Sequence, residues 1–112
     1  STNYIGGLFS YIKNSTITNS YATGNIETIS TSSTSINTYA GGLIGWGSEN
    51  LIVKSCYATG NVSSVGNFNS YIGGFIGNTY NTATIENCYA TGNVTVVIGI
   101  YLLLDHACVV TI

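Results

Sequence analysis

The chain contains one five-residue motif, Tyr-Ala-Thr-Gly-Asn, three times, at residues 21–25, 57–61 and 89–93. A second motif, Tyr-x-Gly-Gly, precedes each copy and begins at Tyr4, Tyr39 and Tyr71. Internal repetition over 32 to 36 residues is typical of a solenoid, in which each repeat is a unit stacked on the last. Glycine recurs too often for helices, and no segment keeps the apolar spacing of a helix. The sequence therefore predicts an all-β fold, a parallel β-solenoid (β-helix), over residues 1–97.

The length of one coil, meaning one full turn of the solenoid, is open between two architectures. Both halves of a repeat begin Tyr-x-x-Gly, and the six tyrosines that start them lie 14 to 18 residues apart. Six short coils would form a column about 30 Å tall, whereas three large coils would form a disc about 15 Å tall. A disc that short exposes most of its core at its two ends. We therefore expect three repeats of 32–36 residues, each of two coils (rungs).

Stacking in register predicts ladders of equivalent side chains. Each fully buried apolar side chain contributes about 2 kcal/mol. The apolar ladders are Leu8, Leu43 and Phe75; Phe9, Ile44 and Ile76; and Ile26, Val62 and Val94. The five-residue motif adds Tyr21, Tyr57 and Tyr89; Gly24, Gly60 and Gly92; and Asn25, Asn61 and Asn93. The glycines mark corners, where a positive φ or a close backbone approach excludes a Cβ, and the asparagine amides are expected to bond along their ladder.

The composition limits the possible partners. Only 5% of residues are charged, the formal net charge is −2, and both basic residues are lysines. A nucleic-acid binder needs clustered Lys or Arg to displace counterions, so that class is excluded. The apolar stretch 94–104 is shorter than the roughly 20 residues that a membrane helix needs, so no membrane insertion is expected. The low charge, the many Thr, Ser and Tyr residues and the lack of methionine, typical of a processed product, indicate an extracellular or cell-surface location.

The residues that usually carry chemistry do not form a recognisable site. Cys56 and Cys88 occupy equivalent positions and are predicted to be buried thiols that fill a ladder, with a disulfide as the alternative. Cysteine and histidine lack the spacing of a zinc site, and the glutamates lie at different phases of the repeat. His106 beside Asp105 lacks the context of a catalytic triad. We expect no enzyme activity, no cofactor and no metal.

The repeat pattern stops after Val97. Residues 98–112 have neither Asn nor Ser. A solenoid needs terminal caps, so this segment is predicted to be a C-terminal cap of the same domain. The alternative is an assembly strand that adds to the edge of a neighbouring molecule.

Two linked motifs give the chain a family resemblance. Gly42-Leu43-Ile44-Gly45, followed by Cys56 to Val62, resembles the GLUG repeat of bacterial secreted and cell-surface proteins. Gly74-Phe75-Ile76-Gly77 with Cys88 to Val94 is a second copy, and Gly7-Leu8-Phe9-Ser10 with Ser20 to Ile26 is a more divergent one. Members of this family are typically segments of large adhesin-like proteins. The resemblance implies a β-helical, non-catalytic, extracellular module and supplies no catalytic residues.

Three functions are compatible with these features. The first is an adhesin stalk or module that contacts host or cell-surface glycans, since tyrosine can stack on sugar rings. The second is a filament subunit that binds other copies of itself, end to end or by strand edges, because uncapped solenoid ends polymerise. The third and most remote is an ice-binding solenoid, for which Thr23, Thr59 and Thr91 make one ladder but no second threonine column lies beside it.

Overall fold

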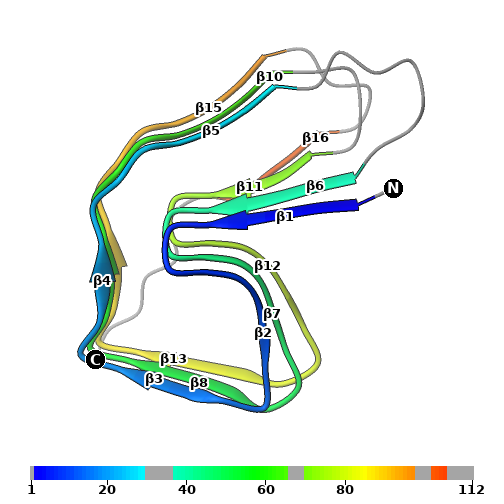
Figure 1. The fold of residues 1–112 in the computed structure, drawn as a ribbon. Helices are drawn as coiled ribbons and strands as arrows, with labels where there is room; N and C mark the ends of the chain where they lie inside the picture. Colours follow the sequence, from blue (N-terminus) through cyan, green and yellow to red (C-terminus); the bar gives the residue numbers. More distant parts are fainter. Residues whose placement is uncertain (1, 30–36, 66–69, 98–101, 106–112) are drawn as a thin grey trace.

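The computed structural model describes residues 2–29, 37–65, 70–97 and 102–105, the last of these as backbone only. These residues form strands joined by tight turns, and every strand pairing is parallel. The all-β parallel solenoid predicted from the repeats is confirmed. Figure 1 views the molecule along the solenoid axis, so that equivalent strands of successive coils overlie one another.

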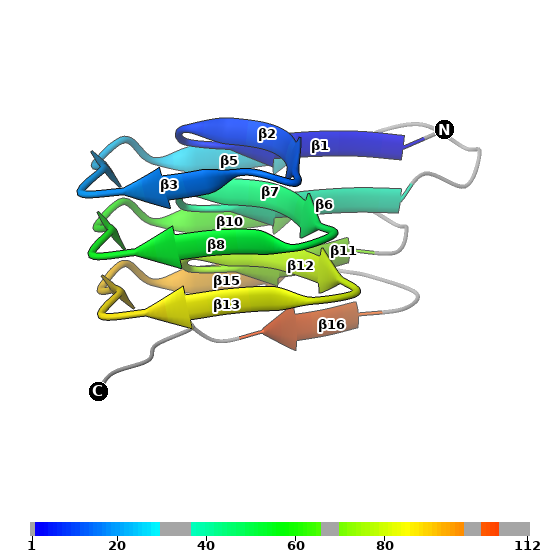
Figure 2. The ribbon, with the colours of Figure 1, turned by 90° about the horizontal axis from the view of Figure 1, so that it is seen from below.

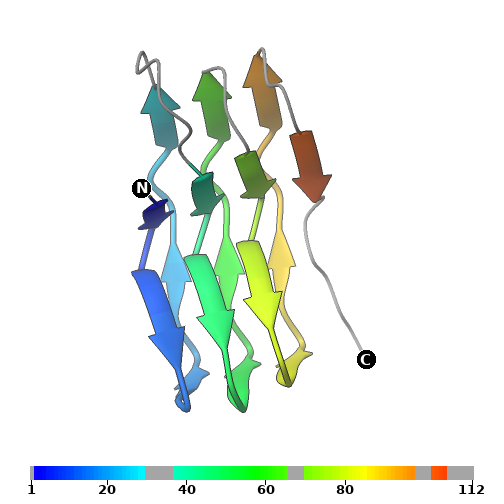
Figure 3. The same ribbon diagram turned by 90° about the vertical axis from the view of Figure 1, so that its right-hand side faces the viewer.

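Each repeat contributes five strands. The first coil holds β1 (Thr2–Gly6), β2 (Phe9–Lys13), β3 (Thr16–Thr18), β4 (Tyr21–Ala22) and β5 (Ile26–Ile29). The second holds β6 (Asn37–Gly41), β7 (Ile44–Ser48), β8 (Leu51–Lys54), β9 (Tyr57–Ala58) and β10 (Val62–Val65). The third holds β11 (Ser70–Gly73), β12 (Ile76–Tyr80), β13 (Ala83–Glu86), β14 (Tyr89–Ala90) and β15 (Val94–Val97), and β16 (Leu102–Asp105) follows. Figures 2 and 3 show the coils stacked side by side.

One repeat forms one coil, so the expectation of two coils per repeat is wrong. Tyr4 pairs with Tyr39 and not with Tyr21, which instead pairs with Tyr57. The two halves begin alike but do different work within the coil. The Gly-Gly half makes a turn that enters the coil, and the other half forms the wall that this turn contacts. They are complementary partners and cannot substitute for each other in a stack.

The glycine pairs explain why the two motifs occur together. Gly42 lies in the turn between β6 and β7, and a Cβ added to it would collide with the backbone oxygen of Gly74 and lie 3.0 Å from the Cβ of Ala58. Gly7 has the same relation to Ala22, at 2.8 Å. In the first two coils, the Gly-Gly turn therefore packs against the small alanine of the Tyr-Ala-Thr-Gly-Asn motif in the same coil.

This turn divides the interior into two apolar cores (Figure 1). The larger core is enclosed by the β2, β3 and β4 sheets and includes Leu43, Ile44, Val53 and Phe75, all fully buried or nearly so. The smaller core lies between the sheets of β1 and β5 and is formed by Ala40, Val62 and Ile72 with partly buried neighbours.

The predicted ladders occupy successive coils. Phe9, Ile44 and Ile76 pair across β2, β7 and β12, and Ile26, Val62 and Val94 pair across β5, β10 and β15. In the third apolar ladder, the Leu8 amide donates to the Leu43 carbonyl and the Leu43 amide donates to the Phe75 carbonyl.

The corner glycines serve close approach and not a left-handed backbone. No described glycine has a positive φ, and a Cβ on Gly60 or Gly92 would collide with the carbonyl of the preceding glycine in the column. Gly24 begins that column and has open space around it. The left-handed positions are taken by other residues, namely Asn14, Asn19, Glu49, Asn50, Ser55, Asn81 and Asn87. Asn and Ser hydrogen-bond locally in such conformations, which suits them to these turns.

The two ends of the stack differ. At the first coil, β1 to β5 are edge strands, and Leu8 is 40% exposed although its equivalent Leu43 is fully buried. At the other end, residues Ser70–Gly73 of β11 pair with β16 on one side and with β6 on the other. Within the described residues, β12 to β15 are edge strands. Of the segment 98–112, which we expected to be a cap or an assembly strand, only the backbone of 102–105 lies inside the described part.

Candidate functional site

The Tyr-Ala-Thr-Gly-Asn motif builds one flat outer face of the solenoid. Its alanines are buried or half-buried, its glycines allow close approach between coils, and its tyrosine, threonine and asparagine side chains lie at the surface. Three columns result: Tyr21, Tyr57 and Tyr89; Thr23, Thr59 and Thr91; and Asn25, Asn61 and Asn93. Every one of these residues is exposed except Tyr57, which is half-buried. We call this surface the outer face.

In the tyrosine column of the outer face, each ring stacks on the next. The ring centroids of Tyr21 and Tyr57 lie 4.9 Å apart, and those of Tyr57 and Tyr89 lie 5.1 Å apart, with interplanar angles of 5° and 4°. Each ring therefore covers a face of the next, and the column presents ring edges and hydroxyl groups to solvent. A sugar ring stacks on an aromatic face, so Tyr57 offers no free platform for one.

The asparagine column is fixed by hydrogen bonds along the axis. The backbone amide of Asn61 donates to Oδ1 of Asn25 over 2.8 Å, and the backbone amide of Asn93 donates to Oδ1 of Asn61 over 2.9 Å. The hydrogen bonds expected along this ladder therefore form between a backbone N–H donor and a side-chain oxygen acceptor. A shallow groove of about 520 Å³ runs beside the column, lined also by Ser63, Thr95 and Glu27.

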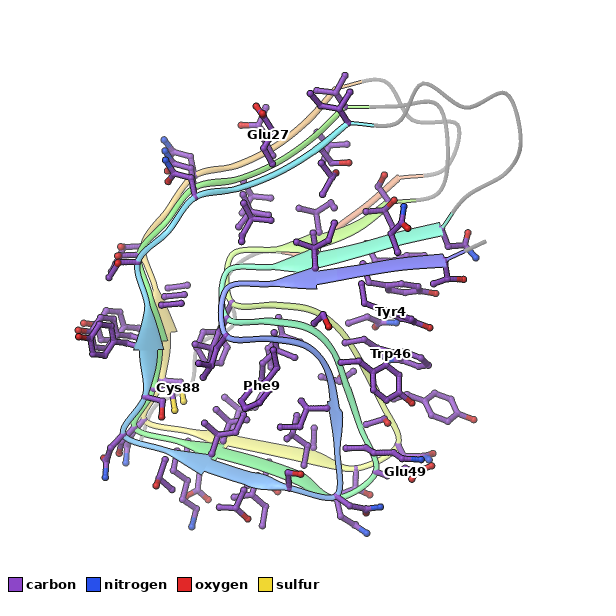
Figure 4. All side chains as sticks on the ribbon, viewed as in Figure 1. Tyr4, Phe9, Glu27, Trp46, Glu49 and Cys88 are labelled. Atoms are coloured by element: carbon purple, nitrogen blue, oxygen red, sulfur yellow. The ribbon has the colours of Figure 1, made fainter. Side chains whose placement is uncertain are left out.

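A second group of aromatic residues lies where the β1 and β2 sheets diverge. Tyr4 and Trp46 both point into the angle between these sheets (Figure 4). The group, which we call the aromatic cluster, comprises Tyr4, Tyr11, Tyr39, Trp46, Tyr71 and Tyr80. Tyr4, Tyr39 and Tyr71 form a stacked column, with centroids 5.4 and 4.6 Å apart.

Trp46 joins this column to the neighbouring sheet. Its ring is nearly parallel to those of Tyr4 and Tyr39, at 5.3 and 5.6 Å, and it meets the ring of Tyr11 edge to face at 5.1 Å. Tyr80 reaches it from the third coil at 6.4 Å, inclined by 61°. Within the described residues, the buried indole Nε1 of Trp46 has no hydrogen-bond partner.

Burial changes the acidity of one ring of the cluster. The pKa of Tyr39 is raised, chiefly because burial disfavours the phenolate and further because negative charge on the neighbouring Tyr71 and Tyr4 would repel it. The middle hydroxyl of this column therefore stays protonated over a wider pH range than a free tyrosine.

Cys56 and Cys88 stand in adjacent coils on the wall of the larger core. Both are buried and free, and their thiols donate to backbone carbonyls: Cys56 to Lys54 at 3.2 Å and Cys88 to Glu86 at 3.2 Å. Burial raises the pKa of the Cys88 thiol above its usual value. They fill a ladder in the core, as predicted for buried thiols, and the alternative of a disulfide between them does not occur.

Few residues of the chain are charged. Lys54 and Glu86 form one exposed ion pair at 3.6 Å. In the described ranges, no three residues of the His, Cys, Asp and Glu types come together as a metal site. The His106 side chain considered above lies outside the described residues, as does the third cysteine, Cys108. Nor do those ranges contain a helix of the length and apolarity that crossing a bilayer requires.

The sequence identified the outer face but missed the aromatic cluster. Three of its members begin the Tyr-x-Gly-Gly motif and the other three lie outside both repeated motifs, and no spacing along the chain indicates that Tyr4 and Trp46 meet. One signal was available: Trp46 is the only tryptophan in the chain, and it stands where neighbouring repeats have Tyr11 and Asn78.

Comparison with known proteins supports the repeat family. Residues 68–95, in the third repeat, match the family model described as the GLUG motif. This match confirms the resemblance that the repeated motifs suggested. The chain matches no curated protein sequence and no solved structure.

Proposed function

We propose that this chain is a non-catalytic structural module, a segment of a β-solenoid stalk in an extracellular or cell-surface protein. Several features support this role. The strand register is the same from coil to coil, which favours a stiff stack. The chain has few charged residues and many hydroxyl groups, and its third repeat matches the GLUG motif. The function of such a module is to hold spacing and to present ladders of side chains.

The first coil carries this proposal. Terminal coils of soluble solenoids usually carry polar residues toward the open end. Here the core positions of the first coil keep the apolar residues of the coils behind them, so that Leu8 and Phe9 are 40% and 38% exposed where Leu43 and Ile44 are fully buried. Five edge strands run along the same end. This end has the chemistry of an internal coil that another parallel coil covers.

β16 favours a continuous stalk over a filament of stacked copies. Head-to-tail assembly in register would place β1 of a second copy against β11 of the first. That position is already taken by β16 of the same chain, which pairs with β11 through Ser70 to Gly73. A filament subunit, the alternative we keep, would first have to release this strand.

Grafting one more coil tests the proposal. A second copy of residues 37–68 placed ahead of Thr2 should continue the stack, bury Leu8 and Phe9 and raise the free energy of unfolding by about 2 kcal/mol or more. Denaturant unfolding measures this gain, and a fused sequence of the same composition in scrambled order is the control. A grafted coil that leaves stability unchanged would refute the stalk proposal.

Sedimentation separates stalk from filament. A stalk segment sediments at a rate independent of concentration once its first coil is covered by the graft. A filament subunit forms longer particles as concentration rises, visible as fibres in negative stain. The original chain lacking residues 98–112 is the second sample. If it forms fibres and the full chain does not, the filament is supported, and β16 is the strand that prevents assembly of the full chain.

A further inference from the structure

The column that contains Trp46 is interrupted in the third coil. Pairing across β2, β7 and β12 places Tyr11, Trp46 and Asn78 in one column, so that two aromatic side chains are followed by a short amide. The neighbouring column of Tyr4, Tyr39 and Tyr71 has a ring in every coil. The position next to Tyr71 on the third coil is therefore the one place in these two columns where an aromatic ring is replaced by a small polar group.

Toward the third coil, the column of Trp46 continues with a residue that has no ring. Trp46 stacks with Tyr4 and Tyr39, the tyrosines of the first and second coils. Toward the third coil, the next residue in its own column is Asn78, which is half-buried and has no ring. Tyr80, two residues further on, is 60% exposed and meets Trp46 obliquely. The indole, the Tyr80 ring that contacts it and the Asn78 amide thus share one position, and Tyr71 stacks on Tyr39, which in turn stacks on the indole.

We propose that this position binds a neutral sugar ring of a glycan, stacked on Trp46 and held by Asn78 between Tyr71 and Tyr80. A pyranose has an apolar C–H face and a rim of hydroxyl groups. It therefore matches an aromatic face that has an amide and phenol hydroxyls beside it. Ser48 and Thr79 near this position are uncharged, and Glu49, which follows Ser48, disfavours an anionic sugar (Figure 4).

The indole N–H gives the site a further reason to take an oxygen-rich ligand. Nε1 of Trp46 is a buried donor without a partner in the described part of the chain. A buried unsatisfied donor is costly, and a hydroxyl acceptor that reaches it would relieve the cost. Tyr80, which is 60% exposed, is the ring of the third coil that contacts Trp46.

Packing alone explains part of the cluster but not this position. Tyr4, Tyr39 and Tyr11 cover one another and the first two coils, as a structural cluster should. Tyrosine or tryptophan at position 78 would complete the column of Tyr11 and Trp46, which is the interrupted one of the two. The outer face provides the contrast, because its tyrosine column runs through all three coils without interruption. The site is independent of the stalk role, since a stalk needs no interruption in either column.

The only tryptophan of the chain reports directly on the site. We would titrate the full chain with soluble cello-, manno- and chito-oligosaccharides and follow the fluorescence of Trp46. At least one of these neutral sugars should produce a saturable change. Oligogalacturonate, which is charged, should produce none.

Variants locate the binding. Asn78→Tyr completes the column and should abolish the sugar response while the unfolding temperature stays the same or rises. Tyr80→Ala should weaken binding about tenfold, the scale of one lost aromatic contact. Tyr89→Ala, on the outer face, is the matched control and should leave affinity unchanged.

Three results would overturn the proposal. They are the absence of a saturable response to all three neutral sugars, a response that survives in Asn78→Tyr, and preferential binding of the charged sugar or of an unrelated unstructured peptide. None of these bears on the grafted-coil experiment, so the binding site and the stalk can fail separately.

Discussion

The two tyrosine columns of this solenoid start from the same sequence pattern and end in different surroundings. On the outer face, the rings of Tyr21, Tyr57 and Tyr89 stack about 5 Å apart. Within the described part of the chain, these rings contact no aromatic ring outside their own column. At the angle between the β1 and β2 sheets, the column of Tyr4 and Tyr39 is joined by Trp46 from another sheet.

The difference lies in what each column can offer to a ligand. A regular ladder uses its ring faces to hold itself together, so it contributes stiffness and leaves ring edges outside. A column that meets a second, irregular column has faces that its own repeat does not cover. If the proposed sugar site is correct, the departure from repeat symmetry at Asn78 indicates it better than the repeated tyrosines do.

The largest effect should come from the turn that lies between the two columns. Gly42→Ala places a Cβ against the Gly74 carbonyl and within 3.0 Å of Ala58, and backbone cannot move away without breaking the stack. We expect a loss of about 3 kcal/mol or more, or failure to fold. Gly24→Ala is the control, because open space surrounds Gly24 and its φ is not positive. Urea unfolding of both variants measures the difference, and equal losses would contradict the packing described here.

The second prediction compares the two aromatic environments directly. The ring of Trp46 contacts those of Tyr4, Tyr11, Tyr39 and Tyr80. The ring of Tyr57 contacts only those of Tyr21 and Tyr89 within the described residues. Trp46→Ala should cost about 3 kcal/mol of unfolding free energy and Tyr57→Ala about 2 kcal/mol. Circular dichroism follows both transitions without depending on the tryptophan. Equal losses would mean that the ring contacts of Trp46 stabilise the fold no more than stacking within a ladder does.

The ladder residues could be predicted from the sequence because repetition alone determines which positions are equivalent. Tyr57 and Tyr89, or Ile26 and Val62, are one repeat apart whatever shape the coil takes. The length of the coil could not be predicted in the same way. The two halves look alike at Tyr4 and Tyr21, and only the contact of Gly7 with Ala22 distinguishes a turn that enters the coil from the wall it meets.

The candidate site was less predictable than the fold. Tyr39 and Trp46 are seven residues apart and belong to different sheets, so their stacking depends on the path of the Gly-Gly turn between them. Ladder logic predicts contacts between coils, one repeat apart. It says nothing about which outward columns converge where two sheets meet at an angle.

A third, smaller effect separates the middle of a ladder from its end. Tyr57 is stacked on both faces, whereas Tyr21 is stacked on Tyr57 alone among the described residues and is 58% exposed. Tyr21→Ala should therefore cost about 1 kcal/mol, half of the loss expected for Tyr57→Ala. Thermal unfolding of the two variants, measured side by side, provides the test. A larger loss at Tyr21 would mean that the column gains its stability from contacts other than stacking.

The smallest effect concerns the alkaline limit of the cluster. The pKa of Tyr39 is raised by burial and by its stacked neighbours, so the unfolded chain releases this proton at a lower pH than the folded chain does. The stability that this ring contributes is complete below about pH 10, the ordinary tyrosine value, and declines as the pH rises from there through the pKa of the folded state. Tyr39→Phe removes the ionisation and keeps the ring. Above pH 10 its unfolding free energy should fall less steeply than that of the original chain, while the two stay parallel at neutral pH. Equal slopes in alkaline solution would mean that Tyr39 ionises as freely in the folded column as in the unfolded chain, and the stacked environment that distinguishes this column from a solvent-facing one would then be absent.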